Sequence, residues 1–301
     1  MQSLSSQSYI GRFAPSPTGP LHAGSLYAAL GSYLDAKANH GQWLLRIEDV
    51  DTLRNVEGAS EAIIESLRSH GLHWDGEAHY QANNNRYYQT GLDQLAIKDS
   101  IFYCNCTRAK LRALGGPYPG FCRLQKKVMY TDATKNKPAS HAIRLACGRQ
   151  KYHMNDRVLG PQIFDMKVLG DCILKRRDSL FAYQLAVVMD DAAHGITHVV
   201  RGADLLESSA WQIALQHSLD FPLLDYAHLP VITLANSEQK LSKQTGAAAL
   251  DNTCARENLL QALQQLRQPL PFDAEQLPIE TLLIWAIEHW NIEHLRMGKN
   301  N

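Results

Sequence analysis

The sequence of 301 residues contains no long hydrophobic run and no hydrophobic leader. No stretch approaches the roughly 18 consecutive apolar residues that a transmembrane helix needs. Residues 1–8 are polar and lack the apolar core of a signal peptide. We therefore expect a soluble, cytoplasmic protein without membrane association. Because apolar residues still make up 45% of the chain, a sizeable folded core is expected rather than disorder.

The chain also lacks an excess of charge of either sign. Lysine plus arginine and aspartate plus glutamate each number 30, so the formal net charge is zero. This balance argues against a protein that coats nucleic acid non-specifically, because such binding requires a strongly basic surface. A nucleic-acid partner would have to be recognised by shape or by an enzymatic site.

Cysteine is scarce, and the six that are present are unevenly spaced. In a cytoplasmic chain of this size, thiols or metal ligands are expected rather than disulfides. Three of the six lie with a tyrosine inside nineteen residues: Cys104, Cys106, Tyr118 and Cys122. A structural zinc ion needs four ligands, and no histidine lies between His79 and His141, so Tyr118 is the nearby donor that remains. The alternative is a group of buried free thiols, the interpretation that we also give to Cys147, Cys172 and Cys254.

The first hundred residues alternate between strand and helix patterns. Strands are expected at 9–15 and 42–47, and helices at 21–38 and 57–70, the second closed by Gly71. This alternation predicts an α/β fold with a Rossmann-type parallel sheet. A cysteine-, glycine- and lysine-rich stretch at 101–168 interrupts it and is interpreted as an insertion.

The sheet pattern is expected to resume after the insertion. We predict strands at 173–176 and 197–201 and helices at 182–190 and 205–219. From Ala255 onward the chain is expected to be helical, and its last helix carries an apolar stripe. The expected division is 1–100, 101–168, 169–220 and 221–301.

The segment R-F-A-P-S-P-T-G-P-L-H-A-G at 12–24 is a proline- and glycine-rich turn placed before a helix. Such a turn presents backbone N–H groups to phosphate. His22 can donate a hydrogen bond to a phosphate, and Gly24 lets a nucleotide approach the backbone closely. The plainer interpretation of an isolated H-x-G is a structural turn with a capping histidine.

A second short segment, K-L-S-K at 240–243, places two lysines three residues apart. Lys240 and Lys243 can hold the charge that develops on phosphates in a transition state. Taken alone, such a pair is more often part of a solvated surface.

Together, the two segments resemble the HIGH and KMSKS signatures of class I aminoacyl-tRNA synthetases. Four further blocks resemble the catalytic half of glutamyl-tRNA synthetase: L-L-R-I-E-D at 44–49, G-L-H-W-D at 71–75, F-A-Y-Q-L-A-V-V-M-D-D at 181–191 and G-I-T-H-V-V-R-G-A-D at 195–204. The resemblance extends from Tyr9 to Lys243.

This resemblance implies an enzyme with ATP, Mg²⁺ and L-glutamate sites. The implied catalytic residues are His22, Lys240 and Lys243, and the implied ATP-binding residues are His22, Gly24 and Lys243. The implied glutamate-binding residues are Arg12, Phe13, Ala14, Pro15, Ser16, Glu48, Tyr183 and Arg201. Among these, Arg12 is expected to pair with the side-chain carboxylate of the substrate, and Glu48 with its α-ammonium group.

The sequence departs from glutamyl-tRNA synthetase in several places. Ser25 replaces the last histidine of HIGH, R-G-A-D-L at 201–205 replaces R-G-E-D-H, and 58 residues follow Lys243. With the Cys-x-Cys…Tyr…Cys insertion, these features resemble the short paralogues that form the glutamyl-queuosine tRNA(Asp) synthetases. The resemblance implies a ligase with a zinc-bearing insertion and no anticodon-binding domain, and a monomer is expected by default. It also implies glutamate activation without tRNA, followed by transfer to the queuosine base of tRNA(Asp).

Three other functions are weighed against this one. An aminoacylating enzyme that charges the 3′ end of tRNA(Glu) is disfavoured by the short C-terminal stretch. A silent paralogue that binds RNA or an amino acid has no physical need for the phosphate-binding residues His22, Lys240 and Lys243. A different nucleotidyl transferase does not account for the blocks that resemble a glutamate site.

Overall fold

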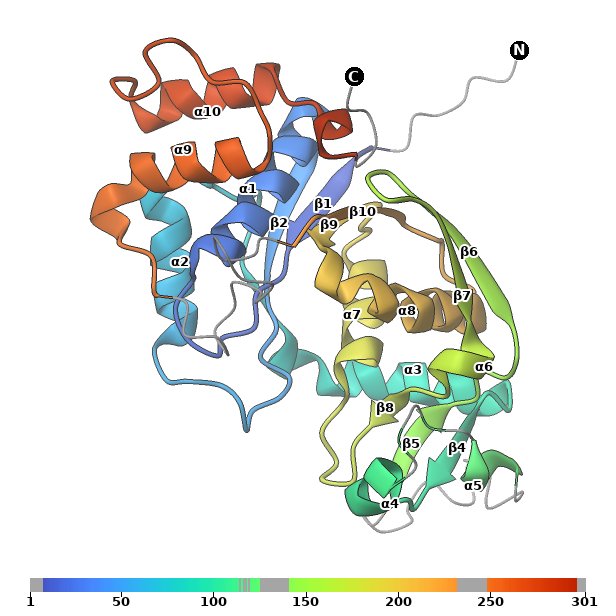
Figure 1. Ribbon diagram of the computed structural model, residues 1–301. Coiled ribbons are helices and arrows are strands. Elements are labelled where there is room, and N and C mark those ends of the chain that lie inside the picture. Colours follow the sequence, from blue (N-terminus) through green and yellow to red (C-terminus); the bar gives the residue numbers. More distant parts are fainter. Residues whose placement is uncertain are drawn as a thin grey trace.

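The computed structural model describes residues 8–113, 115, 118, 120–124, 141–231 and 248–296 (Figure 1). Lys240 and Lys243 lie outside the described residues, so their expected place in the site stays a prediction. Among the residues that are described, no helix combines the length and the hydrophobicity that a membrane crossing requires.

The first half of the chain forms a parallel sheet. Strand β1 (Ile10–Phe13) pairs with β2 (Gln42–Ile47), which pairs in turn with β3 (His79–Tyr80). Helices α1 (Ala23–Ala38) and α2 (Ala59–Ser69) connect these strands, and η1 (Gln81–Asn84) leads into α3 (Asn85–Ile97). The bounds of β2 coincide with the predicted strand, and the expected α/β alternation is confirmed.

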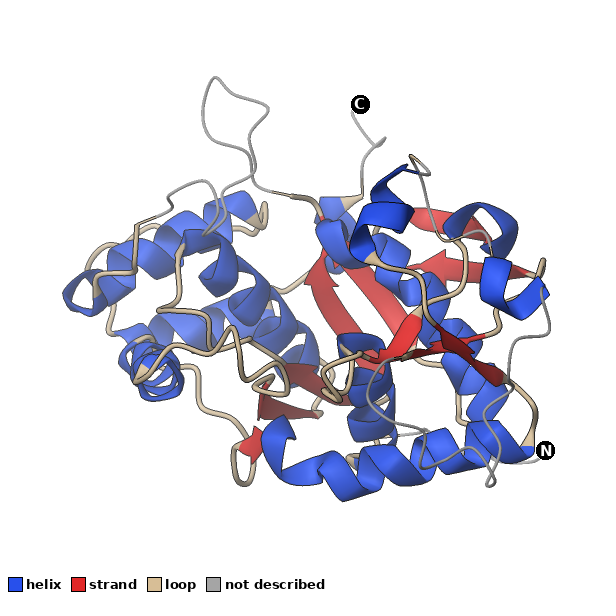
Figure 2. Cartoon of the chain, turned by 90° about the horizontal axis from the view of Figure 1, so that it is seen from below, coloured by secondary structure: helices blue, strands red, loops and turns tan. Residues whose placement is uncertain are grey.

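The second half of the chain adds two parallel strands beside β1. Strand β9 (His198–Gly202) pairs with β10 (Asp225–Leu229), and the backbone N–H of Thr197, just before β9, donates to Ile10 O at 2.9 Å. Helices α7 (Tyr183–Ala193) and α8 (Leu206–Leu219) flank β9, with the short η3 (Ala203–Leu205) between β9 and α8. Helices lie on both sides of the strands (Figure 2), so the Rossmann-type architecture is confirmed.

Each face of the sheet supports a separate hydrophobic core. Along β2, Trp43 and Leu45 pack with α1, whereas Leu44 packs with the core around α3, α7 and α8. Successive side chains of a strand point to opposite faces. Arg46 and Glu48 therefore share the face of Leu44 and are directed toward α7.

The C-terminal helices cover α1 on the outer side of the sheet (Figure 1). They are η5 (Asn252–Cys254), α9 (Ala255–Gln265), α10 (Ile279–Glu288) and η6 (Ile292–Leu295). The predicted apolar stripe of the last helix is confirmed, because Leu282, Leu283 and Ala286 are buried in the core of α1.

The inserted stretch forms its own small sheet at one end of the molecule. Strand β4 (Ile101–Cys104) pairs antiparallel with β5 (Ala142–Leu145), and the short helices α4 (Arg108–Ala113) and α5 (Phe121–Leu124) lie nearby. A hairpin of β6 (Lys151–Asp156) and β7 (Gly160–Asp165) follows, then α6 (Met166–Leu169) and β8 (Ile173–Lys175).

One predicted strand was assigned to the wrong sheet. Strand β8 pairs antiparallel with β5, so residues 173–176 do not resume the parallel sheet. A short strand pattern gives hydrophobicity and spacing but no information about its pairing partner. The β6–β7 hairpin, in contrast, packs against β10, and the backbone N–H of Arg157 donates to Tyr226 O at 2.9 Å.

A buried carboxylate on α1 joins four parts of the chain. The Asp35 side chain accepts from Arg157 Nη1 at 2.6 Å and Nη2 at 3.0 Å, from Trp290 Nε1 at 3.0 Å and from the Tyr9 hydroxyl at 2.5 Å. Burial and the Asp35 charge raise the pKa of Tyr9, so this hydroxyl remains a donor. Asp35 therefore joins α1, the N-terminal strand, the hairpin and the C-terminal helices.

Replacing Asp35 by alanine should lower the free energy of unfolding by about 2–4 kcal/mol, because the Tyr9 and Trp290 donors and the half-buried Arg157 guanidinium lose their common acceptor. Urea unfolding followed by circular dichroism would measure this loss. The Arg296–Glu293 pair offers a control, since both of its side chains are about two-fifths exposed. Glu293→Ala should cost less than about 1 kcal/mol, and an equal loss in both variants would contradict the special position of Asp35.

Candidate active site

A cavity of about 730 Å³ opens at the carboxyl ends of β1, β9 and β10, beside the start of α1. This is where open α/β sheets bind their ligands. Ten of the predicted site residues line it: Arg12, Phe13, Ala14, Pro15, Ser16, His22, Gly24, Glu48, Tyr183 and Arg201. Residues separated by up to 189 positions in the chain are thus brought together.

The N-terminus of α1 is closed by a reciprocal cap. The backbone N–H of Ser25 donates to His22 Nδ1 at 3.2 Å, and the backbone N–H of His22 donates to Ser25 Oγ at 3.5 Å. Ser25 therefore acts as the N3 residue of a capping box, which gives its departure from the HIGH signature a structural role. In the neutral imidazole of His22, accepting at Nδ1 places the proton on Nε2.

Buried charges from three elements meet beneath the cavity. Arg12 of β1 donates from Nε and Nη2 to the Asp191 carboxylate of α7 at 3.2 and 3.5 Å. Arg46 of β2 donates to the same carboxylate at 2.6 Å and to Glu48 at 3.4 Å. One carboxylate thus serves two guanidinium groups. Removing it would leave the buried Arg12 guanidinium without its carboxylate partner and Arg46 with Glu48 alone.

Burial and charge act in opposite directions on the two acids of this cluster. Burial raises the pKa of Glu48 to about 7, against the lowering effect of Arg46 and Arg12. Burial also acts to raise the pKa of Asp191, but Arg12 and Arg46 outweigh it and lower the pKa. Asp191 is therefore the permanent anion of the cluster, and Glu48 changes its charge near neutral pH.

Arg201 of β9 provides a further buried cation at the cavity. Its Nε donates to His228 Nε2 at 3.1 Å, and its Nη2 donates to Ser209 Oγ at 2.8 Å. Its Nη1 is buried without a hydrogen-bond partner. A buried donor of this kind costs free energy until an acceptor reaches it, so Arg201 is suited to an anionic ligand.

Tyr183 begins α7 at the edge of the same cavity. Burial and the Glu48 charge raise the pKa of its hydroxyl, which therefore stays protonated. The groups that line the cavity thus include the guanidinium groups of Arg12 and Arg201, the Tyr183 phenol, His22 and the Glu48 carboxyl group. The exposed side chains of Arg54 and Asp204 line it as well. These groups suit a zwitterionic ligand that carries an additional negative charge.

Sequence reasoning missed the supporting residues of the site: Arg46, Asp191, Ser209, His228 and Asp156. Arg46 lies on the predicted strand 42–47 and Glu48 follows its end two positions later, so their shared face could have been inferred from the alternation of side chains. Asp191 lies in a helix and carries no signal for its distant arginine partners.

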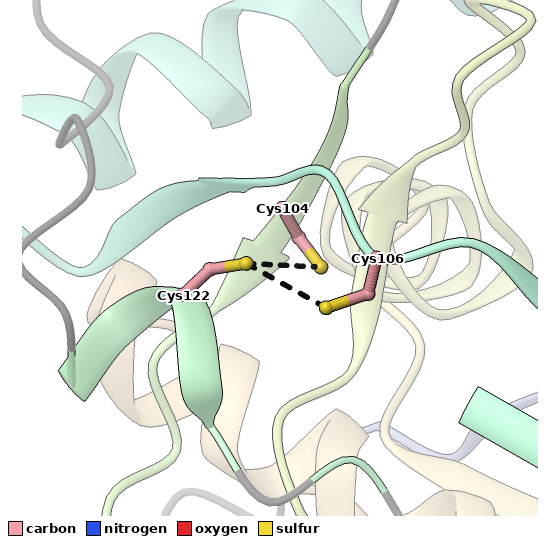
Figure 3. Close-up of side chains that lie close together, drawn as sticks. All are labelled: Cys104, Cys106 and Cys122. Atoms are coloured by element: carbon pink, nitrogen blue, oxygen red, sulfur yellow. Dashed lines mark hydrogen bonds between the residues drawn. The ribbon is translucent and has the colours of Figure 1, made fainter. Parts of the chain in front are cut away.

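Three cysteines form a separate cluster (Figure 3) beside β4 and α5, at one end of the molecule (Figure 1). Cys104 ends β4, Cys106 follows it, and Cys122 lies on α5, with the sulfur atoms directed toward one another. The Cys122 sulfur lies 3.7 Å from that of Cys106 and 3.8 Å from that of Cys104. Sulfurs at about 2.3 Å from a tetrahedral zinc ion would stand about 3.8 Å apart, so the cluster is compatible with zinc.

Tyr118 lies in the same buried cluster. Its hydroxyl accepts from the backbone N–H of Cys122 at 2.8 Å, and the Arg144 guanidinium lies 4.1 Å from its ring centre. The phenol oxygen is therefore held beside the thiols. Cys147 and Cys172 are buried as expected, but the expectation for Cys254 is wrong, because Cys254 is exposed in the turn before α9.

The sequence matches a family model over residues 10–267: the catalytic domain of class I tRNA synthetases (E and Q). A relative from Serratia proteamaculans (strain 568), named glutamyl-Q tRNA(Asp) synthetase, is 46% identical over 96% of this chain and 93% of its own. One of the same name from Vibrio cholerae is 43% identical over 98% and 94% of the two chains. The chain belongs to the glutamyl-Q tRNA(Asp) synthetase family. It is thus a class I ligase.

A solved structure supports the same assignment. The glutamate-tRNA synthetase of Elizabethkingia anophelis superposes with a TM-score of 0.77 at 25% identity, over 96% of this chain and 67% of that one. This chain therefore shares its fold with about two thirds of that synthetase.

The raised pKa of Glu48 should affect stability. Its pKa in the folded protein lies above the value of 4.5 expected when unfolded, so the folded state binds the extra proton and loses stability as pH rises from 4.5 to about 7. Glu48→Gln removes this loss. The free energy of unfolding of the variant, measured relative to wild type, should therefore rise by about 2 kcal/mol between about pH 5 and pH 8. Urea unfolding at both pH values measures this change, and a pH-independent difference would contradict the raised pKa.

Proposed function

We propose that this protein activates L-glutamate with ATP, without tRNA, and transfers the glutamate to the queuosine base at the wobble position of tRNA(Asp). One observation carries the proposal: the N-terminus of α1, which is suited to bind phosphate, opens into the same cavity as four other residues, Arg12, Glu48, Tyr183 and Arg201. The relatives named glutamyl-Q tRNA(Asp) synthetase support the choice of amino acid and RNA.

The charges of the cavity suit glutamate. Among the buried residues that line it, Arg12 and Arg201 are cations and Glu48 is the acid. Arg12 already shares Asp191, whereas Arg201 keeps an unpaired Nη1. The two carboxylates of glutamate can therefore pair with the guanidinium groups of Arg12 and Arg201, and the ionised Glu48 carboxylate can pair with the α-ammonium group.

The ATP phosphates are proposed to lie at the start of α1. There the helix dipole and the backbone N–H groups favour negative charge. The cap orients His22 with its proton on Nε2, and both His22 and Gly24 line the cavity where the nucleotide is proposed to lie. We place Lys240 and Lys243 at the same phosphates as proposed catalytic residues. Mg²⁺ bound with ATP would add charge neutralisation.

The proposed reaction has two steps. An α-carboxylate oxygen of glutamate attacks the α-phosphorus of ATP. The bond between this phosphorus and the oxygen that bridges the α- and β-phosphates breaks, which releases pyrophosphate and forms glutamyl-adenylate. A hydroxyl of the queuosine ring then attacks the activated carbonyl, loses its proton and displaces AMP. The protein contributes positioning and charge stabilisation, and no covalent enzyme intermediate is required.

We further propose that Cys104, Cys106, Tyr118 and Cys122 hold one structural zinc ion. The spacing of the sulfurs and the position of the Tyr118 hydroxyl support this set. Zinc would bind α5 to the end of β4 and so stabilise an insertion whose own sheet has only three strands.

Two radiolabel measurements test the reaction. We expect glutamate-dependent exchange of pyrophosphate into ATP in the absence of tRNA, and transfer of labelled glutamate only to tRNA(Asp) that carries queuosine. Lys243→Ala should reduce the exchange by about 100-fold or more while the fold is kept. Labelling of tRNA(Glu), or of tRNA(Asp) lacking queuosine, would refute the proposal.

Metal analysis tests the zinc site. Wild-type protein should contain about one zinc per chain, and Cys104→Ser should lose most of it together with thermal stability, because a thiolate ligand is removed. Cys254→Ser is the matched control, since Cys254 is exposed and distant from the cluster. Tyr118→Phe should retain zinc but release it faster to a chelator. An unchanged zinc content in Cys104→Ser would eliminate the site.

A further inference from the structure

A chain of polar groups lies behind Arg201, on the side away from the cavity. Arg201 and His228 are paired across the parallel strands β9 and β10, and both are buried. Arg201 Nε donates to His228 Nε2 at 3.1 Å, and His228 Nδ1 lies 2.6 Å from Asp156 Oδ2 at the end of β6. His228 itself does not line the cavity.

The contacts determine the tautomer of His228. An arginine Nε always carries a proton, so His228 Nε2 must accept, and Nδ1 must carry the proton that is donated to Asp156. The Asp156 carboxylate also accepts the backbone N–H groups of Val158, Leu159 and His228. The imidazole is therefore held in one orientation by a carboxylate that cannot turn.

Ser209 of α8 completes the support. Its hydroxyl lies 2.8 Å from Arg201 Nη2 and 3.1 Å from His228 Nε2, and Leu205 O accepts from the same Nη2 at 3.4 Å. The protein thus fixes the edge of the guanidinium formed by Nε and Nη2. Because the guanidinium is planar and rigid, fixing this edge also fixes Nη1, the buried donor without a partner.

The supporting groups at Arg201 are neutral. Arg12 is paired directly with the Asp191 carboxylate, whereas within the described part of the chain no carboxylate forms a salt bridge with Arg201. The imidazole ring separates the Asp156 charge from the guanidinium. This arrangement positions Arg201 while leaving its charge to be balanced by a ligand.

We infer that His228, together with Ser209, is a positioning residue that holds the Arg201 guanidinium ready for a carboxylate of the amino-acid substrate. This inference rests on the proposed function, in which Arg201 binds glutamate. It adds a role for two residues outside the cavity wall.

Steady-state ATP/pyrophosphate exchange, with glutamate and ATP varied in turn, tests the role. His228→Leu should raise the KM for glutamate at least tenfold, with kcat and the KM for ATP changing less than about threefold, because ground-state binding is what the variant loses. His228→Gln keeps both an acceptor and a donor, so its KM for glutamate should lie within about threefold of wild type.

His70→Leu is the matched control. His70 is also fully buried between two polar groups, Ser66 O and Asn258 Nδ2, but it does not line the cavity. It should lose stability and keep the wild-type KM. Ser209→Ala provides an independent variant for the case in which His228→Leu does not fold, with an expected three- to fivefold rise in the KM for glutamate.

An unchanged KM for glutamate in His228→Leu, or in Ser209→Ala if the leucine variant does not fold, would overturn the inference. A fall in kcat with unchanged KM would also overturn it. Absence of glutamate-dependent exchange in wild-type protein would instead refute the proposed function, so the two failures are distinguishable.

Discussion

The sharing of one carboxylate by two buried arginines is the constraint on which the site depends. Asp191 balances Arg12 and Arg46, which project from neighbouring strands onto the same face of the sheet. Asp190, the residue before it, accepts from Gln81, Asn84 and Tyr88 and so holds α7 against η1 and α3. The packing of α7 and the electrostatics of the cavity are therefore determined by the same turn of helix.

This arrangement leaves the buried part of the cavity wall with unbalanced positive charge. Arg12 and Arg46 share the single permanent anion Asp191, Glu48 is only partly ionised near pH 7, and Arg201 is supported by neutral groups. Buried charge of this kind is tolerated where a ligand supplies the counter-charge. The proposed binding of glutamate thus follows from a deficit of carboxylates as much as from the presence of arginines.

Much of the fold was predictable because it depends on local patterns. Strand 42–47 and the helices after it follow from hydrophobic spacing, and the start of α1 follows from the turn that ends at His22. The pairing partner of β8 was not predictable, because the sequence of a three-residue strand does not indicate which strand it will pair with. Cys254 shows the same limit, since its position in an exposed turn depends on the packing of α9.

The sequence by itself determined the chemistry of the site: the residue types at Arg12, His22, Glu48 and Arg201, and the group of cysteines around Tyr118. These residue types were predicted from short motifs and from the resemblance of those motifs to the signatures of glutamyl-tRNA synthetase, although the motifs themselves lie far apart in the chain. Only the tertiary structure decided which charges are balanced. Asp191 reaches Arg12 across 179 positions, and Asp156 reaches His228 across 72. Such pairs are made by strand order and helix packing, which bring distant residues to one face of the sheet.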